Sequence, residues 1–117
     1  MSHNQQFGKR GEDMAASFFK NQGYEIVERN WRCRFGEVDL IIKCGEEWRF
    51  VEVKARQNEV FGYPEEAVTA VKREHFYKAI EIYSQMRGLS PRQVHADVLA
   101  IVLSEKDFDV RWLKDAV

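Results

Sequence analysis

Two apolar strands joined by a tight turn occupy the middle of the sequence. Val38–Lys43 and Glu47–Ala55 are rich in Val, Ile, Phe and Trp, and the residues between them begin with Cys44 and Gly45. A glycine in the first central position favours a two-residue type II′ turn, and such a turn sets the register of the two strands. Because side chains alternate along a strand, a fixed register also determines which residues share a face.

The predicted register places two carboxylates against each other. Asp39 lies opposite Glu52, and Glu37 lies opposite Lys54. Like charges directly opposite on a sheet destabilise it, and local conflicts of this kind tend to mark functional sites. A divalent metal held by both carboxylates removes the conflict, and the backbone carbonyl of Val53 offers a further oxygen. Lys54 then stands where it can stabilise charge or orient a water, which suits hydrolysis of a phosphodiester.

The rest of the chain predicts a mixed α/β domain built around one sheet. The expected elements are a helix at Phe7–Gln22 that ends at Gly23, a strand at Tyr24–Asn30, the two hairpin strands, a helix from Pro64 to Gly88, a strand at His95–Leu103 and an edge strand at Phe108–Trp112. The order is therefore α-β-β-β-α-β-β. With 117 residues and no linker or repeat, we expect a single domain over residues 1–117.

Glu12 is an unusual residue in the first predicted helix. It lies between Ala16 and Phe19, at the margin of the apolar face, where it is the only charge. A carboxylate that faces a core must be paired or bound to a metal. The alternatives are an ion pair with Lys54 or Arg10, or a position at the helix edge with the carboxylate in water.

The charge balance restricts how a nucleic acid could bind. Eighteen Lys and Arg against 19 Asp and Glu give a net charge of −1, so any such partner must be held by a local basic patch. The segment from Arg29 to Phe35 is basic and aromatic, which suits phosphate contact and base stacking; the alternative is a solvated loop anchored by Trp31. The candidate nucleic-acid contacts are Arg32, Arg34, Arg56, Lys72 and Arg73.

Other residues restrict the class of protein further. Two cysteines make no disulfide framework, and no apolar run approaches the roughly 18 residues of a membrane span, so we expect a cytoplasmic protein with no membrane contact. The three histidines have no zinc-ligand spacing with the cysteines, and His75 is expected to pack on the apolar side of its helix. Asp97 interrupts a buried strand and is expected to cap it or to pair with a basic residue.

Gly36–Ile41 followed by Phe50–Arg56 resembles the nuclease signature of the PD-(D/E)XK superfamily, with Val38 in place of the proline. Within that superfamily the chain is similar to the UPF0102 (YraN-like) family over most of its length. Further matching positions are Gly8, Gly11, Glu12, Ala15, Gly23, Tyr24, Asn30, Trp31, Arg32, Phe61, Gly62, Ala67, Val68, Lys72 and Asp97. The resemblance implies a restriction-endonuclease-like fold with three α/β/α layers and a mixed central sheet.

The related archaeal Holliday-junction resolvases combine a first-helix Glu, an Asp and a Glu-x-Lys. Here these correspond to Glu12, Asp39, Glu52 and Lys54. The resemblance thus implies a metal-dependent endonuclease that uses Mg²⁺ or Mn²⁺ to hydrolyse DNA phosphodiesters, with branched or repair-related DNA as the expected substrate. Asp39, Glu52 and the Val53 carbonyl are expected to hold the metal, and Glu12 to join them directly or through water.

Two alternatives remain open at the level of the sequence. The chain could be a non-catalytic nucleic-acid-binding or assembly module that retains a nuclease-like fold, because fold alone does not guarantee activity. It could also work as a homodimer, since its last strand offers an apolar edge. Glu37 is expected to lie next to the metal site, and the alternative of a cross-strand pair with Lys54 is equally open.

Overall fold

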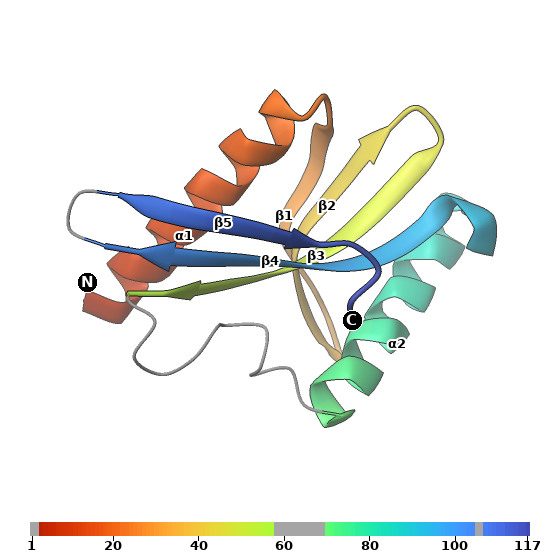
Figure 1. The fold of residues 1–117 in the computed structure, drawn as a ribbon. Coiled ribbons are helices and arrows are strands. Elements are labelled where there is room, and N and C mark those ends of the chain that lie inside the picture. Colours follow the sequence, from red (N-terminus) through yellow and green to blue (C-terminus); the bar gives the residue numbers. More distant parts are fainter. Residues whose placement is uncertain (1–2, 58–69, 105–106) are drawn as a thin grey trace.

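The computed structural model describes residues 3–57, 70–104 and 107–117 (Figure 1). Its elements are α1 His3–Asn21, β1 Glu25–Cys33, β2 Gly36–Cys44, β3 Glu47–Arg56, α2 Ala70–Arg87, the short 3-10 helix η3 Pro91–Gln93, β4 Val94–Leu103 and β5 Phe108–Leu113. The strands form one sheet in the order β1-β2-β3-β4-β5. Among the described strands only the β3–β4 pair is parallel, as expected for two strands whose connection contains a helix, so the predicted mixed sheet is confirmed.

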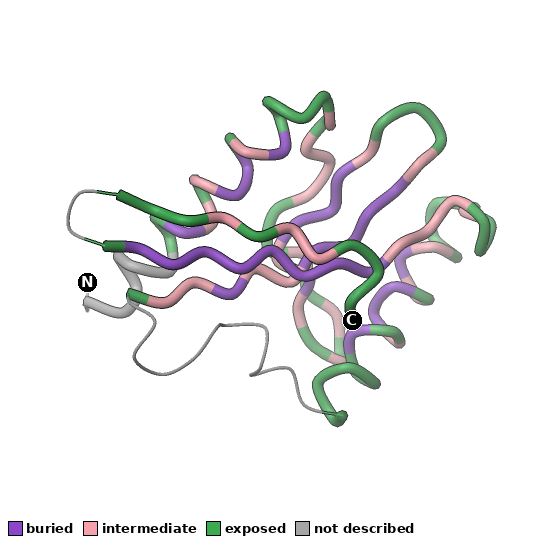
Figure 2. The backbone as a smooth tube through the Cα atoms, in the orientation of Figure 1, coloured by how far each residue is buried: buried purple, intermediate pink, exposed green. Residues whose placement is uncertain are grey.

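The helices cover opposite faces of the sheet and build two separate cores. Ala15 and Phe19 of α1 pack with a cluster of sheet residues that includes Leu40. Phe76 and Tyr83 of α2 belong to the other cluster. Strand β4 is consequently buried along most of its length, as Figure 2 shows. The three-layer α/β/α arrangement and the predicted element order are confirmed.

Helix α1 ends where the sequence predicts. Gly23 has a φ of +92°, which is open to glycine because it lacks a Cβ. Its N–H donates to the carbonyl of Lys20 at 3.0 Å, and the N–H of Tyr24 donates to Phe19 at 3.0 Å. These two bonds form a Schellman motif, which satisfies helix carbonyls that would otherwise lack a partner.

The central hairpin has the predicted register. Leu40 pairs with Val51, and the ladder continues to Cys44 and Glu47 at the turn. Gly45 has a φ of +61°, whereas the only described non-glycine residues with positive φ are Asn30 and Asp115. The turn therefore has positive φ at its first central position only, as type II′ requires.

Some element bounds differ from the sequence prediction. Strand β1 continues to Cys33, because Trp31 pairs with Val38 and packs edge-on against Tyr83 with ring centroids 5.2 Å apart. Trp31 therefore lies in a strand and not in a solvated loop. The predicted helix start at Pro64 lies outside the described residues, and the edge position of β5 is confirmed. No described helix is long and apolar enough to cross a membrane.

Candidate functional site

The pairing of β2 with both of its neighbours is interrupted at Asp39. Towards β3, the last pair is Leu40 with Val51, so the ladder ends before Asp39 reaches Glu52. Towards β1, the ladder skips Asn30, which lies across from Asp39. The sheet therefore opens at the residue that the sequence singled out.

The side chain of Asp39 replaces part of the missing ladder. Its Oδ2 accepts a hydrogen bond of 2.8 Å from the backbone N–H of Val53. The N–H and C=O of one strand residue point to the same side, so the Val53 carbonyl also faces β2. The carboxylate of Asp39 and the carbonyl oxygen of Val53 therefore lie at the same edge of β3.

Three carboxylates meet at this opening. The oxygens of Glu12, Glu37 and Asp39 lie within 4.8 Å of one another, and all three residues are partly buried. Glu37 and Asp39 share a face of β2, whereas Glu12 comes from α1. The partner of Glu12 is Asn30, whose Nδ2 donates to it at 3.1 Å, and not either of the cations considered from the sequence.

A close helix–strand contact allows Glu12 to reach the sheet. A Cβ added to Gly11 would lie 2.9 Å from the Cβ of Ala55 on β3, closer than real Cβ atoms approach. Only glycine therefore permits this separation of α1 and β3. Since Glu12 is the next residue, the contact also determines how near its carboxylate comes to Asp39.

Glu52 and Lys54 form an ion pair on β3 beside the carboxylates. Their charged atoms are 3.1 Å apart, and the Lys54 side chain is only 9% exposed. The predicted pair of Glu37 with Lys54 was wrong: Glu37 accepts from Arg32 at 3.0 Å. The reason is that the β2–β3 ladder ends at Leu40 and does not hold Glu37 against β3.

The surroundings of Asp39 disfavour its negative charge. The pKa of Asp39 is raised to about 7. Burial is the largest cause, followed by the charge of Glu52; Glu37 and Glu12 also raise the pKa, and the Val53 N–H lowers it. Neighbouring like charges in a partly buried site disfavour each other's ionised form, and a cation between them removes this repulsion. This carboxylate is thus in the kind of environment in which a bound metal ion gives the greatest relief.

A cavity of about 380 Å³ opens at the carboxylates. Strands β2 and β3 provide one wall, and α2 provides another that includes Lys72. Contact with the Lys54 ammonium group, followed by burial, lowers the pKa of Lys72. The cavity is lined by Phe35, Gly36, Glu37, Asp39, Glu52, Lys72, His75, Phe76 and Val117.

None of the other four predicted nucleic-acid contacts lines this cavity. Arg32 is ion-paired to a carboxylate that lines it, and Arg34 lies over the ring of Phe35, with its Cζ 4.8 Å from the centroid. Arg56 donates to the carbonyl of the preceding residue at 3.1 Å, and Arg73 is exposed on α2. Neither Arg56 nor Arg73 lines the cavity.

Two side chains at the site were not assigned to it from the sequence. His75, predicted to pack on the apolar side of its helix, is exposed and lines the cavity. That prediction was wrong because the buried face of α2 runs along Phe76 and Tyr83, which leaves His75 at its margin. Asn30 gave no chemical signal, since its contact with Glu12 depends on a backbone φ of +53°.

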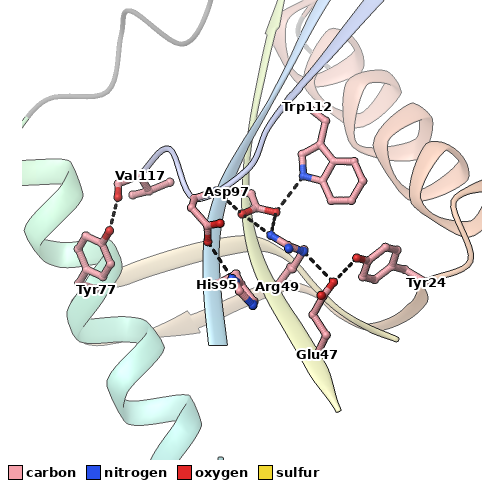
Figure 3. Close-up of polar contacts among 9 residues, drawn as sticks. Tyr24, Glu47, Arg49, Tyr77, His95, Asp97, Trp112 and Val117 are labelled. Atoms are coloured by element: carbon pink, nitrogen blue, oxygen red, sulfur yellow. Dashed lines mark hydrogen bonds and ion pairs between the residues drawn. The ribbon is translucent and has the colours of Figure 1, made fainter. Parts of the chain in front are cut away.

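A second polar cluster joins β3, β4 and β5 (Figure 3). Arg49 donates to Asp97 at 3.0 and 3.1 Å and to Glu47 at 2.9 Å, and Tyr24 also donates to Glu47. The indole N–H of Trp112 donates to Asp97 at 2.8 Å. The expectation that Asp97 pairs with a basic residue is thereby confirmed, and none of these residues lines the cavity at Asp39.

The donor atoms at Asp39 fit a hard divalent cation. Carboxylate and backbone carbonyl oxygens are the ligands that Mg²⁺ and Mn²⁺ prefer, and no cysteine or histidine belongs to this carboxylate group among the described residues. Lys54 and Lys72 add positive charge beside the carboxylates. The site therefore combines oxygen atoms that could hold a cation with ammonium groups that could bind an anion.

The chain is similar to a known protein family over most of its length. The sequence profile of "Uncharacterised protein family UPF0102" matches residues 11–110. A UPF0102 protein of Caldicellulosiruptor saccharolyticus is 39% identical over 113 residues, which cover 95% of this chain and 96% of the relative. One from Syntrophus aciditrophicus is 39% identical over 116 residues (99% and 91%), and one from Chloroherpeton thalassium is 43% identical over 105 residues (90% and 81%). The chain therefore belongs to the UPF0102 family.

Proposed function

We propose that this protein is a metal-dependent endonuclease that hydrolyses DNA phosphodiesters. The observation that carries the proposal is the group formed by Glu12, Glu37 and Asp39 at the opening of the sheet, with Glu52 and Lys54 beside it. An open cavity adjoins this group. Crowded carboxylates next to an ammonium group suit a cation and a phosphate together.

Glu12, Glu37 and Asp39 would hold Mg²⁺ or Mn²⁺, with Glu52 and the Val53 carbonyl on the adjoining edge of β3. When bound, the cation would supply Lewis-acid chemistry, which polarises a phosphoryl oxygen and promotes ionisation of water. The ion pair with Glu52 fixes the ammonium group of Lys54 at the same place.

The cationic side chains act on the phosphate itself. Lys54 is buried, so its charge acts in a medium less polar than water and can stabilise negative charge as it develops on the phosphoryl group. Lys72 approaches from the opposite wall of the cavity. We assign contacts with flanking phosphates to Arg32 and Arg34, whose neighbours Glu37 and Phe35 line the cavity, and outer contacts to Arg56 and Arg73.

The substrate we propose is branched or repair-related DNA. Phe35 lines the cavity and can stack on an unpaired base, which a continuous duplex does not offer. Cutting two strands would need two copies of the site, and β5 offers an edge for a homodimer, with Phe108 55% exposed on it.

The direct test is cleavage of labelled four-way-junction, single-stranded and duplex DNA by the purified protein with Mg²⁺ or Mn²⁺. We expect metal-dependent cleavage by the wild type and loss of at least about 100-fold in rate on D39A, because the cation and its charge stabilisation are lost. D109A, which removes an exposed carboxylate of β5, is the matched control. Absence of cleavage on every substrate, or equal cleavage by D39A, would contradict the proposal.

Metal binding distinguishes the carboxylates from one another. We expect Mn²⁺ affinity, measured by titration calorimetry, to fall more on E37Q than on E52Q, because Glu37 belongs to the group within 4.8 Å and Glu52 is held by Lys54. Equal losses would indicate that Glu52 leaves Lys54 and coordinates the metal as strongly as Glu37 does.

The second candidate function is nucleic-acid binding without catalysis. The near-neutral charge and the exposed Arg32, whose side chain is 78% exposed, favour a modest binding surface. This function predicts a mobility shift without cleavage that persists in E52Q and is lost in R32A. Metal-dependent cleavage that D39A abolishes would exclude it.

A further inference from the structure

Asn30 has a backbone conformation that few residues adopt. Its φ is +53°, and among the described non-glycine residues only Asp115 shares this property, with a φ of +55°. A side chain other than Asn or Asp is strained in this left-handed region, whereas Asn tolerates it. The conformation occurs inside β1, a strand that otherwise pairs with β2 on both sides of Asn30.

The unusual backbone coincides with a specific side-chain contact. Asn30 Nδ2 donates to Glu12 Oε2 at 3.1 Å, and this bond links β1 to α1. An ionised carboxylate only accepts hydrogen bonds, so the amide nitrogen is the atom that must face it. Glycine would satisfy the backbone equally well but would offer Glu12 no donor.

The hydrogen bond between Asn30 and Glu12 also lies at the group of carboxylates. Asn30 lies across from Asp39, and the carboxylate that it binds lies within 4.8 Å of Glu37 and Asp39. Without a donor, Glu12 would be repelled by both of these charges and could turn into solvent. Hydrogen bonds that orient a metal ligand typically change metal affinity by about 10- to 100-fold when removed.

We infer that Asn30 is a positioning residue, which holds the Glu12 carboxylate in the metal-binding group by donating its side-chain amide. The inference rests on the proposed metal site and names a residue to which no chemistry is otherwise assigned. The left-handed backbone at Asn30 directs the amide towards α1, and the interrupted ladder there is the structural consequence.

Two substitutions separate the amide from the backbone. N30G keeps the left-handed conformation and removes the donor, whereas N30A removes the donor and also strains the backbone. We expect both variants to lose about tenfold or more in Mn²⁺ affinity by titration calorimetry, although only N30A should lose thermal stability. D115G, which changes the other left-handed position, should bind Mn²⁺ as the wild type does. Wild-type affinity in N30G would overturn the inference.

A double-mutant cycle tests whether Asn30 acts through Glu12. In an E12A background, N30G should produce no further loss of Mn²⁺ affinity, because the carboxylate that it positions is absent. Additive losses would overturn the inference, since Asn30 would then act on another group.

A metal-free measurement tests the Asn30–Glu12 contact itself, and Mn²⁺ binding then separates this inference from the proposed function. Relative to the wild type, the side-chain amide signals of Asn30 in a ¹H–¹⁵N spectrum should be shifted in E12A and unchanged in D109A. If the wild type binds no Mn²⁺, both the metal site and the positioning role fall, whatever the spectrum shows. If Mn²⁺ binds and N30G has no effect, the inference falls while the metal site stands.

Discussion

At the scale of single residues, Asp39 accepts a hydrogen bond from the backbone in surroundings that disfavour its negative charge. Its carboxylate is held by a backbone N–H of β3, yet it is partly buried and lies close to the charges of Glu52, Glu37 and Glu12. A structural role alone would favour a neutral residue at this place, because an uncompensated buried charge is unfavourable. The raised pKa of Asp39 is the electrostatic feature expected if, as proposed, this carboxylate binds a cation.

Replacing Asp39 should change how stability depends on pH. The pKa of this carboxyl is raised from 3.8 to about 7 in the folded protein, so the folded state binds the proton more tightly than the unfolded chain. Folding stability of the metal-free protein should thus decline as pH rises from 3.8 to about 7, and D39N should remove this decline and be more stable above it.

Urea denaturation on both sides of that range measures the effect, with D109N as the control that keeps the wild-type slope. Saturating Mn²⁺ should reverse the decline in the wild type and leave the pH dependence of D39N unchanged. An unchanged pH dependence in D39N would mean that another group titrates over this interval.

At the scale of the elements, the site depends on how closely α1 approaches β3. Both helices are amphipathic, and packing of an apolar face alone would allow a range of separations. The contact of Gly11 with Ala55 selects a short one, and the opening of the β2–β3 ladder leaves space for the acidic side chains. The geometry of the site thus depends on the close contact of Gly11 with Ala55 and on the absence of ladder pairing between Asp39 and Glu52.

Filling the contact should displace the helix. G11A places a Cβ 2.9 Å from the Cβ of Ala55, so α1 must shift, and we expect a loss of about 1–3 kcal/mol in stability together with weaker Mn²⁺ binding. The double variant G11A/A55G transfers the methyl group from the strand to the helix and should recover Mn²⁺ affinity. Urea denaturation and calorimetry measure the two effects, and failure of A55G to restore binding would refute the steric explanation.

The Arg49–Asp97 pair should affect stability and leave the site intact. Asp97 is fully buried and also accepts from Trp112, so removing Arg49 leaves a buried charge without its main partner. We expect R49M to lose about 3–5 kcal/mol in the free energy of unfolding, a large part of the total for a domain of this size. Mn²⁺ affinity of the folded variant should equal that of the wild type, and a loss would mean that this cluster supports the metal site.

At the scale of the whole molecule, the net charge is close to zero, and the charges that matter for binding are concentrated around the cavity. The net charge of −1 provides no general attraction for DNA, and a group of carboxylates repels phosphates unless a cation is present. Binding should therefore rely on the few cations around the cavity and on the metal. This arrangement favours weak, metal-dependent association over tight non-specific binding.

The salt dependence of DNA binding measures how many cations are used. If Arg32, Arg34 and Lys72 contact phosphates, the logarithm of duplex affinity should fall with the logarithm of salt concentration with a slope of about −3. R34A should reduce the slope by about one, whereas substitution of Arg92, an exposed residue of η3 away from the cavity, should leave it unchanged. Fluorescence anisotropy of the wild type with labelled, cleavage-resistant DNA at constant Mn²⁺ concentration provides the measurement, and a slope near zero would contradict phosphate contact.

The sequence by itself determined the features that depend on neighbouring residues. Gly45 favours the observed tight turn and hence its register, and Gly23 ends α1 with two short-range hydrogen bonds. Alternation along the strands then put Asp39, Glu52 and Lys54 in one region, because side-chain direction follows from position in the strand. These predictions needed no knowledge of how distant segments pack.

Only the tertiary structure decided which groups meet around Asp39. Glu37 binds Arg32 and joins the carboxylates because the ladder ends early, and His75 lines the cavity because of how α2 lies on the sheet. Asn30 reaches Glu12 through a left-handed backbone whose neighbours do not reveal it. Turns and strand faces are set by local sterics and hydrogen bonds, whereas the partners of a charged side chain are set by the packing of elements far apart in the chain.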